Sequence, residues 1–109
     1  FGKSLDGFTP IGPCIVTADA FADYPPRLGI RSFVNGEKRQ DSNTALQIFD
    51  IDHVIAELSQ GMTLKAGTII ATGTPAGVGM GMDPPQFLKP GDVVRCEIDG
   101  IGTLTNPVE

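Results

Sequence analysis

The segment from Thr68 to Gly79 contains the side chains best suited to bind a ligand. It opens with an apolar run, residues 68 to 71, whose length predicts a buried strand. A loop of small residues follows, in which Thr72 and Thr74 carry hydroxyls that donate or accept hydrogen bonds. Three glycines in the same loop would let its backbone approach a ligand closely, because glycine has no Cβ. A buried strand that feeds such a loop could form a cradle for an anion.

Taken alone, this loop pattern is weak evidence for a ligand site. No Lys-Ser or Lys-Thr pair follows the glycines and the GxGxxG spacing is absent, so the loop is not a P-loop. A glycine-rich turn between two strands is the alternative interpretation, and a phosphate-binding module is the least favoured one.

Most of the chain is expected to form short strands joined by tight turns. Asn35-Gly36 is typical of a two-residue hairpin turn, because both positions tolerate positive φ, and it predicts a hairpin over residues 29 to 41. Residues 93 to 98 alternate in polarity, Asp99-Gly100 forms a turn, and residues 101 to 105 form a closing strand. An apolar run over residues 14 to 17 predicts a further strand.

A single short helix is expected over about residues 53 to 60. Asp52 can cap its N-terminus and Gly61 can end it. The preceding turn is expected to carry Leu46, Ile48 and Phe49 inward. The resulting fold class is mostly β, a β-rich α+β arrangement with one short helix.

Length, composition and charge limit the class of protein. The 109 residues fit one domain, 1–109, with no internal boundary and a modest hydrophobic core. A net charge of −5 argues against nucleic acid as a partner, because binding phosphate requires clustered Lys and Arg. No apolar run approaches the length needed to span a membrane.

Several polar or titratable residues outside the loop receive a structural interpretation. Cys14 and Cys96 are expected to be buried free thiols, although a disulfide in an oxidising compartment is the alternative. His53 is expected to be a surface histidine, because no second ligand stands at metal-binding spacing. The basic pair Lys38-Arg39 is expected to be a solvated strand edge that discourages aggregation.

Five further sequence blocks accompany the glycine loop of residues 72–79. They lie at residues 1–13, 34–44, 58–64, 87–94 and 100–107. In this order and at these spacings, the blocks resemble the fumarylacetoacetate hydrolase family. The nearest branch contains acylpyruvate hydrolases, oxaloacetate decarboxylases and hydroxymuconate-type isomerases, and the resemblance covers the carboxy-terminal half of its catalytic domain. It implies that family's fold of short mixed strands and hairpins, incomplete in this chain.

The resemblance implies metal-assisted chemistry beside a 2-oxo acid or β-dicarbonyl group. The expected cofactor of the complete enzyme is Mg²⁺, with Mn²⁺ or Ca²⁺ as alternatives, and it would stabilise the enolate that develops. The family's metal ligands, a Glu-x-Glu pair and an aspartate, have no counterpart here, so no residue of this chain is assigned to the metal. A general base cannot be named either, because residues 82 to 89 contain no glutamate.

Two positions carry over from the family's motifs, and the backbone of a third residue assists one of them. Lys3, within Gly2-Lys3-Ser4, matches a catalytic lysine that contacts bound substrate. Thr74 matches a threonine that hydrogen-bonds the substrate carboxylate, with the backbone of Gly73 as a helper. Two polar residues in a neighbouring block, at positions 40 and 43, are interpreted as turn and packing residues.

Two functional hypotheses follow from these observations. The first is part of a Mg²⁺-dependent hydrolase, isomerase or decarboxylase that acts on small anionic 2-oxo acids, for example in aromatic catabolism. It is expected to be cytoplasmic, or mitochondrial in a eukaryote, and a homodimer without nucleic-acid or membrane partners. The alternative is a truncated, non-catalytic β-domain with an interaction or structural role, because the chain lacks the metal ligands and a base.

Overall fold

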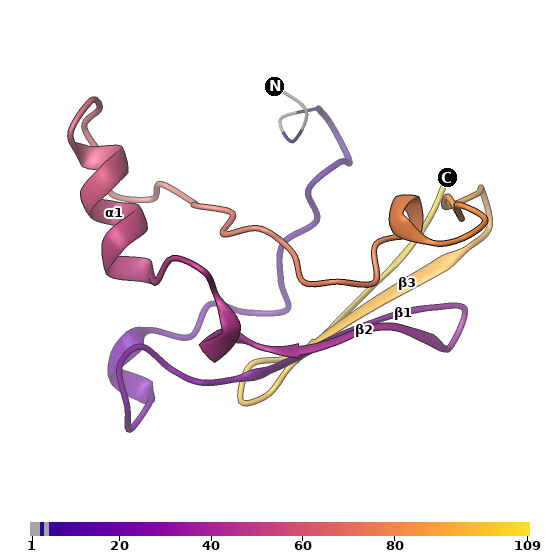
Figure 1. Ribbon diagram of the computed structural model, residues 1–109, viewed down its shortest axis with the longest axis horizontal. Helices are drawn as coiled ribbons and strands as arrows, with labels where there is room; N and C mark the ends of the chain where they lie inside the picture. The colour runs from indigo at the N-terminus through magenta and orange to yellow at the C-terminus, as the bar shows by residue number, and fades with distance from the viewer. Residues whose placement is uncertain (1–2, 4) are drawn as a thin grey trace.

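The computed structural model describes residue 3 and residues 5–109, and its centre is an antiparallel sheet of four strands in the order β2-β1-β3-β4. Helix α1 stands apart from this sheet, and the chain returns from α1 toward the sheet through an irregular segment, coloured pink to orange in Figure 1. Over the described residues the fold is therefore β-rich with one short α-helix, as expected, although these strands are all antiparallel. The strands and the α-helix are β1 (Gly29–Val34), β2 (Glu37–Asn43), α1 (Ile51–Ser59), β3 (Val93–Ile98) and β4 (Gly102–Pro107), and three 3₁₀ turns are η1 (Ala18–Ala20), η2 (Thr44–Leu46) and η3 (Gly79–Gly81).

The predicted hairpin between β1 and β2 is confirmed. Asn35 and Gly36 have φ values of 51° and 84°, the left-handed conformations that such a two-residue turn requires. The side chain of Asn35 also bonds beyond the turn: its Nδ2 donates to Asp92 at 2.8 Å, and its Oδ1 accepts from the backbone N–H of Val93 at 2.9 Å. The hairpin tip is thereby joined to the start of β3.

A β-bulge interrupts the pairing of β1 with β2. Ser32 pairs with Gln40 and Phe33 pairs with Lys38, so Arg39 is an extra residue without a partner in β1. Side chains alternate between the two faces of a strand, so the extra residue determines which face the following residues occupy.

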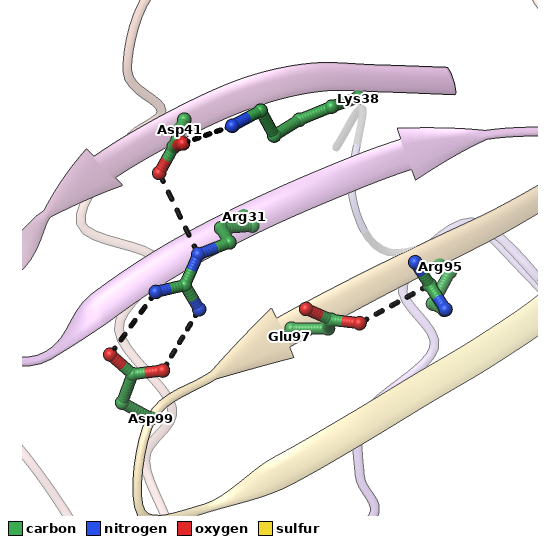
Figure 2. A network of polar contacts seen from close by, with 6 residues as sticks. All are labelled: Arg31, Lys38, Asp41, Arg95, Glu97 and Asp99. Carbon is green, nitrogen blue, oxygen red and sulfur yellow. Dashed lines mark hydrogen bonds and ion pairs between the residues drawn. The ribbon is translucent and has the colours of Figure 1, made fainter. Parts of the chain in front are cut away.

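One face of the sheet carries a polar network, which Figure 2 shows. Arg31, in the central strand β1, contacts Asp99 at 2.8 Å and Asp41 at 3.7 Å. The hydrogen bond from Arg31 lowers the pKa of Asp99 below its ordinary value. The hydrogen bond from Lys38 likewise lowers the pKa of Asp41. These ion pairs join β1 to β2 and to the turn after β3.

Helix α1 begins two residues earlier than the sequence indicates. Asp50 is its N-cap, accepting from the backbone N–H of His53 at 2.8 Å, so the prediction of Asp52 as the cap was wrong. Asp52 lies in the first turn instead, where its carboxylate accepts a hydrogen bond from the hydroxyl of Tyr24 at 2.7 Å. That hydrogen bond raises the pKa of the Tyr24 phenol.

Two predicted strands, residues 14 to 17 and 68 to 71, are irregular in the structure. The thiol of Cys14 donates to the carbonyl of Ile101 at 3.5 Å, which holds the first segment beside the turn between β3 and β4. The second segment pairs with no strand among the described residues. An apolar run becomes a strand only when a neighbour accepts and donates its backbone hydrogen bonds.

The expected hydrophobic core is not formed by the described residues. None of them is buried, and the radius of gyration of 15.3 Å exceeds the value of about 13 Å typical of a compact domain of this length. Leu46, Ile48 and Phe49, which were expected to point inward, are 73%, 92% and 59% exposed. These predictions were wrong because the described residues supply no surface that covers the apolar side chains.

The prediction for the two cysteines was correct in one respect and wrong in another. Both cysteines are free, as expected, but both are exposed, so the prediction that the thiols are buried was wrong. His53 is exposed, as expected, and its ring stacks on Phe49 with 4.7 Å between ring centroids. Within residues 3 and 5–109, no helix is both long enough and apolar enough to cross a membrane.

We predict that Asp99→Asn removes an acid-sensitive part of the protein's stability. The folded pKa of Asp99 is lowered, so its ion pair stabilises the fold above the ordinary aspartate pKa of about 4 and is lost as the pH falls through the folded value. The free energy of unfolding of the intact protein, measured in urea from pH 7 to pH 3, should differ between wild type and variant at neutral pH and converge in acid. Asp23→Asn, at an exposed aspartate without an ion pair among the described residues, is the matched control. A wild-type advantage that persists unchanged to pH 3 would contradict the assignment.

Candidate functional site

The glycine loop forms one wall of a groove of about 670 Å³. This volume lies within the range of about 300–1,000 Å³ found for small-molecule sites. The opposite wall comes from the end of β2, from η2 and from the start of α1. The groove is lined by Ile30, Ser42, Asn43, Thr44, Leu46, Gln47, Ile48, Phe49, Val54, Thr72, Gly73, Thr74, Pro75 and Ile98.

Two of the loop glycines are required by close backbone contacts. A Cβ at Gly77 would overlap the backbone carbonyl of Arg39, and the φ of Gly77 is 104°, a value that favours glycine. A Cβ at Gly79 would overlap the carbonyl of Gln86. The loop can therefore lie directly against strand β2 at the bulge.

Hydrogen bonds from Gln40 hold the same loop at its other end. Its Nε2 donates to the hydroxyl of Thr74 at 2.7 Å and to the carbonyl of Pro75 at 2.9 Å. Its Oε1 accepts from the hydroxyl of Ser32 at 2.8 Å. The interpretation of Gln40 as a turn or packing residue was therefore incomplete, because its amide connects the sheet to Thr74.

Asn43 has the structural role that the sequence indicated. Its side chain accepts from the backbone N–H of Ala45 at 2.9 Å and caps the short turn η2. Thr44, the first residue of η2, accepts from the backbone N–H of Leu28 and donates to the carbonyl of Pro26. These contacts fix the wall of the groove that faces the glycine loop.

Arg39 is not the solvated edge residue that the sequence indicated. Its side chain is only 17% exposed, and its guanidinium contacts Gln86 at 2.6 Å, Met82 at 3.1 Å and Glu37 at 3.3 Å. The bulge turns this side chain toward residues 82 to 86, which it holds against the hairpin. Lys38 is exposed, as expected, and pairs with Asp41.

Lys3 is not among the residues that line the groove. It is exposed, and its backbone carbonyl accepts a hydrogen bond from the hydroxyl of Thr9 at 2.5 Å. The indigo segment that follows residue 4 lies away from the four-stranded sheet in Figure 1. The association of Lys3 with Thr74 in one site therefore stays a prediction.

The groove does not have the ligands that a divalent cation needs. Its lining contains hydroxyls, amides and apolar groups but no carboxylate or imidazole, whereas Mg²⁺ and Mn²⁺ sites are built around carboxylates. No group of three or more His, Cys, Asp or Glu residues within residues 3 and 5–109 could hold a metal ion. The arrangement suits an anion instead, because uncharged donors line the groove without a negative charge to repel it.

A second hollow, of about 580 Å³, lies beside Arg31 and Asp99 but is more open to solvent. The charges of these two residues are paired with each other, so this hollow offers no unpaired cation to a ligand. The groove beside Thr74 is the better candidate site.

The whole chain matches one protein family. The model for the C-terminal domain of fumarylacetoacetate (FAA) hydrolase covers residues 1–109. The chain belongs to the fumarylacetoacetate hydrolase family. This confirms the family resemblance, and the fold agrees with that of solved family members.

Relatives and solved structures with different names share this similarity. The mitochondrial oxaloacetate tautomerase fahd2 of Xenopus laevis is 51% identical over 107 residues, which are 98% of this chain and 33% of that protein. The fumarylacetoacetate hydrolase of psychrophilic Exiguobacterium antarcticum is 55% identical with a TM-score of 0.92, over 99% of this chain and 38% of its own. Maleylpyruvate hydrolase of Sphingobium sp. SYK-6, solved with a manganese (II) ion and pyruvate, is 44% identical with a TM-score of 0.84, over 97% of this chain and 37% of its own. The chain thus spans 33% to 38% of the length of these three proteins.

We predict that Gly77→Ala displaces the glycine loop from β2. The added methyl group meets the Arg39 carbonyl, and the existing φ of 104° is unfavourable for alanine, so the free energy of unfolding should fall by roughly 2–3 kcal/mol. Gly61→Ala is the control, because no atom lies within 4 Å of a Cβ built there, and it should change stability by less than about 0.5 kcal/mol. Chemical unfolding of the intact protein measures both variants. Equal stability of the two variants would show that the loop does not pack on the bulge.

Proposed function

We propose that this chain is the carboxy-terminal part of a metal-dependent enzyme that acts on small 2-oxo acid or β-dicarbonyl substrates. The observation that carries the proposal is the uncharged, hydroxyl-bearing groove beside Thr74, in a chain that belongs to the fumarylacetoacetate hydrolase family. The related maleylpyruvate hydrolase was solved in complex with pyruvate, which is a 2-oxo acid. This complex supports a 2-oxo acid as the class of substrate here.

Thr74 and Gly73 bind the substrate carboxylate in this proposal. Both line the groove, where a hydroxyl and a backbone N–H can donate to one carboxylate group. Such charge-assisted hydrogen bonds orient the 2-oxo acid and place its reacting carbon at a fixed position. Lys3 supplies an ammonium group that neutralises a second carboxylate or an oxyanion that develops during reaction.

The divalent cation of the complete enzyme, Mg²⁺ or Mn²⁺, would be bound by residues outside this chain. The lining of the groove contains no suitable ligand, and the manganese in the maleylpyruvate hydrolase structure supports the use of a divalent metal in the family. When bound, such an ion acts as a Lewis acid toward the 2-oxo group. The residues described here bind and orient the anionic end of the substrate.

The names of the relatives support several related reactions. They name a tautomerase of oxaloacetate, an isomerase of 5-carboxymethyl-2-hydroxymuconate and a hydrolase of maleylpyruvate. We propose one of these reactions, in a homodimer located in the cytoplasm, or in the mitochondrion as the Xenopus relative's name states for that protein. A truncated β-domain that functions alone is not favoured, because so many of its large apolar side chains are exposed.

We predict that Thr74→Val raises KM for a 2-oxo acid substrate by roughly 10-fold or more, because it removes a hydrogen bond to a charged group at nearly constant volume. The intact protein would be assayed with acylpyruvate, oxaloacetate and hydroxymuconate-type substrates in the presence of Mn²⁺ or Mg²⁺. Thr63→Val, which makes the same chemical change at an exposed residue outside the groove, should leave KM unchanged.

Lys3→Ala in the same assay tests the second predicted contact. It should lower kcat/KM by roughly 10²-fold if the ammonium stabilises a developing oxyanion, whereas Lys65→Ala should have little effect. An intact protein that turns over none of these substrates with either metal would overturn the proposed function. Full activity of both the Thr74 and the Lys3 variant would overturn the assignment of the site.

A further inference from the structure

Gln40 lies on the sheet face beneath the glycine loop, and all of its amide hydrogen-bonding groups are engaged. Ser32, its partner across the β1–β2 pair, donates to its Oε1, while its Nε2 donates to the Thr74 hydroxyl and to the Pro75 carbonyl. The side chain is half-buried between the sheet and the loop. Hydrogen bonds to the sheet and to the glycine loop thus determine its position.

The carbonyl of Pro75 fixes which end of the amide faces the loop. A carbonyl oxygen can only accept a hydrogen bond, so the group 2.9 Å from it must be the NH₂ of Gln40. If the amide were flipped, two acceptor oxygens would face each other. One N–H of Gln40 therefore points to Pro75, and the other points to the oxygen of Thr74.

This orientation determines the direction of the Thr74 hydroxyl. A hydroxyl has one hydrogen to donate, and its oxygen here already accepts from Gln40. The hydrogen must therefore point to another acceptor, and no residue within the described part of the chain accepts it. Thr74 lines the groove, so its O–H is available to an anion bound there.

We propose that Gln40 is a positioning residue that orients the Thr74 hydroxyl as a hydrogen-bond donor toward the substrate carboxylate. This inference rests on the proposed function, in which Thr74 binds that carboxylate. The hydroxyl of Ser32 orients the amide of Gln40, and this amide orients the hydroxyl of Thr74 toward the substrate. Gln40 itself does not line the groove and acts through Thr74.

The test exchanges the donor of Gln40 for an acceptor at nearly the same size. In Gln40→Glu the carboxylate accepts a hydrogen bond from Thr74 and withdraws its hydroxyl from the ligand. Binding of pyruvate to the intact protein in the presence of Mn²⁺, measured by calorimetry, should weaken by roughly 10- to 100-fold, the loss typical of a hydrogen bond to a charged group. KM for a substrate should rise by a similar factor while kcat changes little.

Two further variants separate this effect from the added charge. Gln40→Met removes the donor without introducing a charge and should weaken pyruvate binding by roughly 3- to 10-fold, because the hydroxyl is then no longer oriented. Gln60→Glu makes the same charge change at the exposed end of helix α1 and should bind pyruvate as the wild type does. Thermal unfolding of each variant confirms that it is folded before binding is measured.

A double-mutant cycle with Thr74→Val shows whether Gln40 acts through Thr74. Without the hydroxyl, Gln40→Met should cause no further loss of pyruvate affinity, because the two residues form one unit. The inference is overturned if Gln40→Met binds pyruvate normally, or if its effect persists undiminished in the Thr74→Val background. A wild-type protein that binds no pyruvate with Mn²⁺ would overturn the proposed function, and this inference with it. Normal binding by wild type and by both Gln40 variants would overturn the inference alone.

Discussion

The β-bulge at Arg39 determines which side chains of β2 face the glycine loop. With regular pairing, a two-residue turn would place Arg39 opposite Ser32, and Gln40 opposite Arg31. The extra residue instead pairs Gln40 with Ser32 and Asp41 with Arg31. Because a shift of one residue exchanges the two faces of a strand, the glutamine reaches the loop and the aspartate joins the ion pairs on the opposite face.

The groove depends on a loop that is held by contacts with the sheet and not by regular secondary structure of its own. Gly77 allows the loop backbone to touch the bulge, and Gln40 holds Thr74 and Pro75 from below. The same segment contains apolar side chains that no described residue covers, such as Ile69 with 69% exposure. Large uncovered apolar surfaces are typical of interfaces, which agrees with the proposal that this chain supplies only part of an active site.

Local turn chemistry made part of this fold predictable, and missing partners made the rest unpredictable. Asn35-Gly36 specified the first hairpin, and the alternation over residues 93 to 98 specified β3, because both signals are contained in a few adjacent residues. The apolar runs at 14–17 and 68–71 are not strands, because they pair with no neighbouring strand among the described residues. The sequence of a run does not reveal whether such a neighbour is present. The motif predicts Thr74 as a ligand residue, and this remains a prediction. The contact of Gln40 with Thr74 could not be predicted, because no sequence signal indicates the bulge that turns Gln40 toward the loop.

In the proposed site, the Thr74 hydroxyl donates to the carboxylate of a 2-oxo acid while its oxygen accepts from Gln40. A crystal structure of the intact protein with Mn²⁺ and pyruvate tests this claim most directly. We predict a pyruvate carboxylate oxygen within about 2.5–3.0 Å of Thr74 Oγ1, with the amide of Gln40 still bonded to that atom from the side of the sheet. A carboxylate bound away from the glycine loop, or a Thr74 hydroxyl that donates to a protein group, would contradict the claim.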